Sequence, residues 1–100
     1  MTTPVDPRKA AEARINEVIA IVEQQPEGEA RATLLEECRA LARAIGAFHM
    51  EGIRFRAFNV DRLLQKGTLP LPAAATEAFL LMRGHLEQAG FHTRSHQSPV

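Results

Sequence analysis

One apolar stripe runs through the middle of this 100-residue chain without a change of phase. Its members are Leu34, Cys38, Leu41, Ile45, Phe48, Gly52 and Phe55. Steps of four and three residues are typical of one face of an α-helix. The spacing continues through Gly46 and Gly52, and no Pro, Asn or Ser lies near Gly46 to form a turn. The stripe therefore predicts one continuous helix.

Proline and glycine positions divide the chain into three predicted helices. These helices span residues 6–25, 26–66 and 72–89. Asp6 and Pro7 indicate a helix start, because an aspartate side chain can accept a hydrogen bond from a free N-terminal amide and proline fits the first helical position. Pro26 separates the first two helices, and Gly67 ends the second. Abundant Ala, Leu, Glu and Arg with few β-branched residues also favour an all-α fold.

We expect a single all-helical domain over residues 6–91, with a flexible arm at 1–5 and a flexible tail at 92–100. A helix over 26–66 would be about 60 Å long, at 1.5 Å per residue, and each outer helix about half that. Short connections require each outer helix to fold back on the long one. The predicted protomer is therefore two helical hairpins on one central helix.

A protomer only two helices thick leaves one side of the apolar stripe in water. We therefore expect an antiparallel homodimer that completes a dimeric helical bundle. The expected dimer interface consists of Leu34, Cys38, Leu41, Ile45, Gly46, Phe48, Gly52 and Phe55. The distribution of charge agrees with this arrangement. Residues 1–51 carry six basic and nine acidic side chains, and residues 52–100 carry six basic and three acidic ones. An antiparallel dimer would place the acidic half of one chain beside the basic half of the other.

A second architecture stays open. Each glycine inside a helix costs about 1 kcal/mol relative to alanine, so a break near Gly46 would remove an unfavourable contribution. The chain would then fold four short helices into a compact monomer. The unchanged phase of the stripe favours the continuous helix over this alternative.

Few residues offer chemistry. Cys38 lies on the apolar stripe, so we interpret it as a small buried hydrophobic residue rather than a nucleophile. We expect no metal site and no cofactor, since His49 and Glu51 are two residues apart and point in different directions on a helix. The sharpest candidate ligand site pairs His49 with Arg56, which a two-fold axis would gather into a central anion pocket. The simpler alternative is a satisfied histidine and an ion-paired arginine.

Two other partners are not expected. Arg54, Phe55, Arg56 and Phe58 resemble the alternation of basic and aromatic residues found in proteins that bind single-stranded nucleic acid. We expect both phenylalanines to lie on the apolar face, where they cannot stack on bases. No apolar run approaches the length of about 18 residues that a membrane span needs, so we expect a cytoplasmic protein.

A helical fold of this size does not by itself select a function. The leading hypothesis is a small homodimeric helical module that binds another protein, as adaptor, assembly factor or regulator, without catalytic activity. The alternative is a sensor or carrier of a small ligand or anion, with its pocket at the centre of the dimer.

Overall fold

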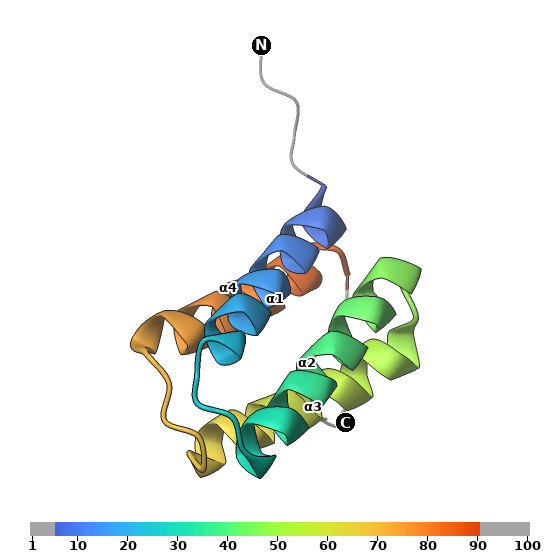
Figure 1. The fold of residues 1–100 in the computed structure, drawn as a ribbon. Helices are drawn as coiled ribbons and strands as arrows, with labels where there is room; N and C mark the ends of the chain where they lie inside the picture. Colours follow the sequence, from blue (N-terminus) through green and yellow to red (C-terminus); the bar gives the residue numbers. More distant parts are fainter. Residues whose placement is uncertain (1–5, 91–100) are drawn as a thin grey trace.

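A computed structural model describes residues 6–90 of the chain. This range contains four α-helices and no β-strand. The helices are α1 (Pro7–Glu23), α2 (Glu29–Ala47), α3 (Met50–Lys66) and α4 (Ala73–Gln88), as Figure 1 shows. The all-α class expected from the composition is confirmed.

The four helices pack in two layers. Helix α1 contacts both α4 and α2, and α2 also contacts α3. In Figure 1, α1 lies in front of α4, and α2 lies in front of α3. The radius of gyration is 13.4 Å, close to the value of about 13 Å typical of a compact domain of this length. The chain is therefore one compact four-helix unit around a single core rather than a pair of thin hairpins.

The continuous helix expected over residues 26–66 is wrong, because the chain reverses direction at Phe48 and His49. Phe48 adopts the left-handed conformation, with φ 56° and ψ 41°. This conformation costs a residue other than glycine on the order of 1 kcal/mol. Helix ends of this kind ordinarily carry glycine at this position, so the local sequence gave no indication of a turn.

Hydrogen bonds hold the turn on both sides. The Phe48 amide donates a hydrogen bond to the Ile45 carbonyl, and the His49 amide donates one to the Ala44 carbonyl. Both N–O distances are 3.0 Å. These two bonds form a Schellman motif, which satisfies carbonyls at the end of a helix. His49 then caps the next helix at once, because its Nδ1 accepts a hydrogen bond of 2.9 Å from the Gly52 amide. Two residues thus end α2 and start α3.

Every helix contributes one stripe of apolar residues to the core. The buried residues are Ala11, Ile15, Val18 and Val22 of α1; Leu34, Leu35, Cys38, Leu41 and Ile45 of α2; Ile53, Ala57 and Val60 of α3; and Ala75, Ala78, Phe79, Met82 and Leu86 of α4. In α1 and in α4 the buried residues lie on a single helix face, at the spacing typical of an amphipathic helix. In α3 the buried stripe is a different one, because the reversal turns another face of that helix toward α2.

The observed architecture resembles the second alternative, four short helices in one compact chain, with the break two residues after Gly46. Gly46 and Gly52 do allow close approach, but within the chain. A Cβ atom on Gly46 would lie 2.9 Å from Oε2 of Glu12 in α1. A Cβ atom on Gly52 would lie 3.0 Å from Nδ1 of His49 and 3.3 Å from Cβ of Ala44. Both glycines of the expected dimer interface therefore lie beside side chains of their own chain.

The two glycines should respond oppositely to alanine. At Gly46→Ala the only crowded atom is the end of the flexible Glu12 side chain, so the gain in helix propensity should raise the free energy of unfolding by about 0.5–1 kcal/mol. At Gly52→Ala the new methyl group would crowd the Ala44 Cβ and the His49 ring that caps α3. This substitution should lower the free energy of unfolding by about 1 kcal/mol. Urea denaturation measures both, and equal effects would contradict the assignment.

Candidate functional site

The structure separates the eight residues expected at a dimer interface. Leu34, Cys38, Leu41 and Ile45 are buried by the chain itself. Gly46, Phe48 and Phe55 are exposed, and Gly52 is partly buried. The buried four lie in the core of the chain, so they cannot form the surface that meets a second subunit.

His49 and Arg56 each have a partner within the chain. Nη1 of Arg56 donates to both carboxylate oxygens of Glu37, at 3.1 and 3.2 Å. The guanidinium of Arg56 also lies 5.0 Å from the ring centroid of Phe55. His49 is the cap of α3 described above. These contacts match the simpler alternative, and the continuous helices whose crossing would have formed an anion pocket do not exist in this chain.

Loss of the His49 cap should weaken the fold measurably. His49→Ala removes the acceptor for the Gly52 amide and should lower the free energy of unfolding by about 1 kcal/mol. His49→Asp is the matched control, because aspartate is a strong N-terminal cap and should retain most of the stability. Urea denaturation compares the two variants, and an alanine variant as stable as the aspartate variant would exclude the capping role.

Cys38 lies in the core of the bundle with no exposed surface. Burial raises the pKa of its thiol to about 12, and the negative charge of Glu37 adds to this increase. The thiol is therefore protonated at neutral pH, and the thiolate is the form that attacks an electrophile. The interpretation of Cys38 as a buried hydrophobic residue is confirmed.

The thiol should consequently react slowly in the folded protein. At pH 8, modification of Cys38 by a disulfide reagent such as DTNB should be slower by on the order of 100-fold or more than in the urea-unfolded chain, because reactivity follows the thiolate fraction. Absorbance of the released thiolate measures both rates. Equal rates in the native and unfolded states would show that Cys38 is accessible.

Residues 6–90 hold no group of three or more His, Cys, Asp or Glu side chains placed to bind a metal ion. Over the same range, no helix combines the length and the apolarity needed to cross a bilayer.

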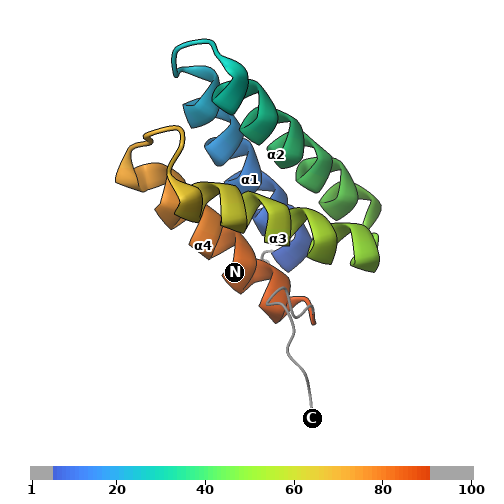
Figure 2. The same cartoon turned by 90° about the horizontal axis from the view of Figure 1, so that it is seen from below.

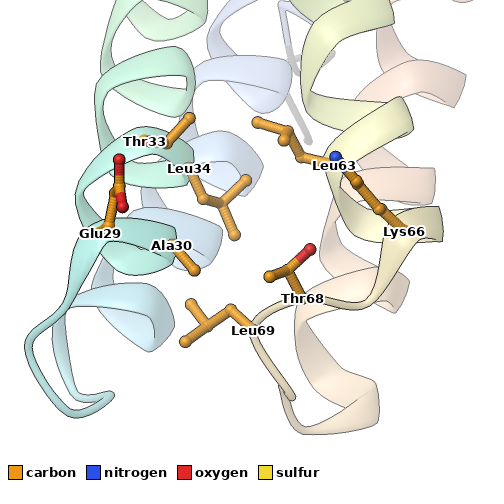
Figure 3. A pocket seen from close by; sticks show the side chains of 8 residues that line it. All are labelled: Glu29, Ala30, Thr33, Leu34, Leu63, Lys66, Thr68 and Leu69. Atoms are coloured by element: carbon orange, nitrogen blue, oxygen red, sulfur yellow. The ribbon is translucent and has the colours of Figure 1, made fainter.

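One hollow of about 250 Å³ lies between the start of α2, the end of α3 and the segment that follows α3. Its lining residues are Glu29, Ala30, Thr33, Leu34, Leu63, Lys66, Thr68 and Leu69, shown in Figure 3. Glu29 and Lys66 approach it from opposite sides. The volume is below the range of about 300–1,000 Å³ typical of ligand pockets, and neither His49 nor Arg56 lines it.

The most unusual surface is the side of α3 that faces away from the core. We call it the α3 outer face and define it by Glu51, Phe55, Phe58 and Arg62. Because an α-helix turns about 100° per residue, these four side chains fall within an arc of about 60°. Phe55 is 57% exposed and Phe58 is 47% exposed. The expectation that both phenylalanines lie on the apolar face is wrong.

Arginine side chains lie beside both exposed rings. The guanidinium of Arg62 is 5.9 Å from the ring centroid of Phe58, and Arg56 lies over Phe55 as described above. Aromatic residues and arginine are enriched at the centres of protein–protein interfaces and dominate their binding energy. The α3 outer face therefore has the composition of an interaction surface. A second exposed apolar pair, Leu80 and Leu81 of α4, contains no aromatic ring.

No protein family, curated protein or solved structure matches this chain. The candidate site accordingly depends on the geometry of the chain itself. Sequence reasoning missed Phe58 and Arg62 because it extended the phase of α2 into α3. One sequence pattern indicates the observed orientation of α3. Ile53, Ala57 and Val60 also follow steps of four and three residues, and a helix that buries them has Phe55 and Phe58 on its opposite side.

Proposed function

We propose that this chain is a non-catalytic helical module that acts by binding a protein through the α3 outer face. The observation that carries the proposal is a pair of half-exposed phenylalanine rings, Phe55 and Phe58, with arginines over them. Burying such rings against a partner is favourable by about 25 cal/mol for each Å² of apolar surface removed from water. Roles as adaptor, assembly factor or regulator in the cytoplasm are all compatible with this mode of action.

The three residues considered above for catalysis or anion binding have other roles in the structure. Cys38 is buried with a raised pKa. Arg56 is paired with Glu37, and the His49 ring caps α3. These contacts support a binding role over the alternative of an anion sensor or carrier.

Charge on the α3 outer face supports a protein partner over nucleic acid. The face carries one acidic residue, Glu51, and one basic residue, Arg62. Surfaces that bind single-stranded nucleic acid combine their aromatic residues with a positively charged groove that follows the phosphates. A carboxylate beside Phe55 would repel that backbone.

Photo-crosslinking from the surface tests the proposal. The photoreactive residue p-benzoylphenylalanine at position 58 should give a discrete crosslinked product on irradiation, because the ring would be buried against a bound protein. Denaturing gel electrophoresis and mass spectrometry detect the product. Its mass also identifies the partner, since two copies of the 11.0 kDa chain would give a band of about 22 kDa.

Leu81 provides the matched control, since it is 48% exposed and Phe58 is 47% exposed. The same photoreactive residue at position 81 should give little product. Equal crosslinking from both positions, or none from position 58, would contradict the assignment of the α3 outer face.

A further inference from the structure

We propose that the protein bound by the α3 outer face is a second copy of this chain, docked with its α3 helix antiparallel to the first. This inference rests on the proposal that the face binds a protein, and it names the partner. It differs from the dimer expected from the sequence, because the contact is made by residues on the opposite side of α3 from the core.

The spacing along α3 is symmetric. Glu51, Phe55, Phe58 and Arg62 follow one another at steps of four, three and four residues. A two-fold axis that passes between residues 56 and 57 therefore places position 51 opposite position 62 of the partner subunit. It also places position 55 opposite position 58 of the partner subunit. Such a self-complementary patch is what a two-fold symmetric interface requires.

The charges are complementary in this register. Glu51 would lie opposite Arg62 of the partner subunit, and symmetry repeats the pair, so two bridges flank the centre. Both side chains are exposed, and within residues 6–90 neither forms an ion pair. A parallel arrangement would instead set Glu51 against Glu51 and Arg62 against Arg62, which like charges disfavour.

The rings form the centre of the proposed contact. Phe55 would pack on Phe58 of the partner subunit, and symmetry repeats this pair as well, so four rings come together. Aromatic pairs in offset or edge-to-face geometry add favourable energy beyond that of area burial. Arg56 and Arg62 lie beside the rings and help to fix their positions before docking. This reduces the ordering cost of association.

The neighbouring positions do not oppose the register. The same axis sets Arg54 opposite the uncharged Asn59 and sets Met50 opposite Leu63. No two like charges face each other across the contact. In Figure 2, no other described helix lies over α3, so its outer side is open to a partner.

One helix from each subunit makes a small interface. Contacts below about 1,200 Å² are typical of weak and transient complexes. We therefore expect a dissociation constant on the order of 10 μM rather than an obligate dimer.

Charge reversal tests the inference by sedimentation equilibrium of the full chain. Glu51→Arg alone sets two pairs of arginines against each other, and Arg62→Glu alone sets two pairs of glutamates against each other. Each single variant should raise the dissociation constant at least tenfold. An equimolar mixture of the two variants restores an opposite charge at both bridges, so it should form a heterodimer with a dissociation constant within about threefold of the wild type. Circular dichroism checks that both variants are folded.

Three outcomes would overturn the inference. A wild-type mass of one chain at every concentration up to about 1 mM would exclude the second copy. If crosslinking from position 58 still captured a different protein, the proposed function would stand while this inference failed. A dimer that both single variants leave intact, or a mixture that does not recover, would exclude the antiparallel register.

Discussion

The reversal at Phe48 and His49 is the constraint on which the rest of the structure depends. It places a phenylalanine in the left-handed conformation and recovers that cost through two backbone hydrogen bonds and a histidine cap. The turn occupies two residues, so α3 must run back along α2. The apolar stripe of α2 is then covered by the chain itself and needs no second subunit.

Helix α1 completes the enclosure by contacting both α2 and α4. Ion pairs join the helices at the surface: Arg39 with Glu23 at 2.7 Å, Arg56 with Glu37 at 3.1 Å, and Arg83 with Asp61 at 3.6 Å. The first pair is exposed and the other two are half-buried, and ion pairs at a protein surface contribute little to stability individually. The buried stripes of the four helices therefore provide most of the stability, and the ion pairs help to fix how the helices align.

The same reversal determines the surface that the chain presents. Helix α3 packs on the core through Ile53, Ala57 and Val60. Its opposite side, with Phe55 and Phe58, is therefore left in contact with water. Exposing two aromatic rings is unfavourable for an isolated chain, and a partner that covers them relieves that cost. The fold thus connects an internal packing requirement to the surface that we propose for binding. The symmetric placement of Glu51 and Arg62 around the rings makes the surface complementary in charge to a second copy of itself in the antiparallel register that we propose.

Much of the architecture follows from local sequence signals. Asp6 accepts the hydrogen bond from the Arg8 amide as an N-terminal cap, and Gly67 adopts a left-handed φ of 70° at the end of α3. The buried stripes of α1 and α4 also follow directly from apolar periodicity. These features depend on residues close together in the chain, so the sequence alone is sufficient to predict them.

Only the tertiary structure decided where the central helix ends and which side of α3 is buried. Continuing the phase of the α2 stripe and restarting at Ile53 are equally regular as patterns, because both follow steps of three and four residues. The structure follows the second pattern, because folding α3 onto α2 buries Ile53 and Val60. The favourable free energy of this burial exceeds the cost of the left-handed conformation at Phe48. The candidate site could not be predicted for the same reason. Contacts between helices decide whether Phe55 and Phe58 lie in the core or on the surface, and local periodicity does not contain those contacts.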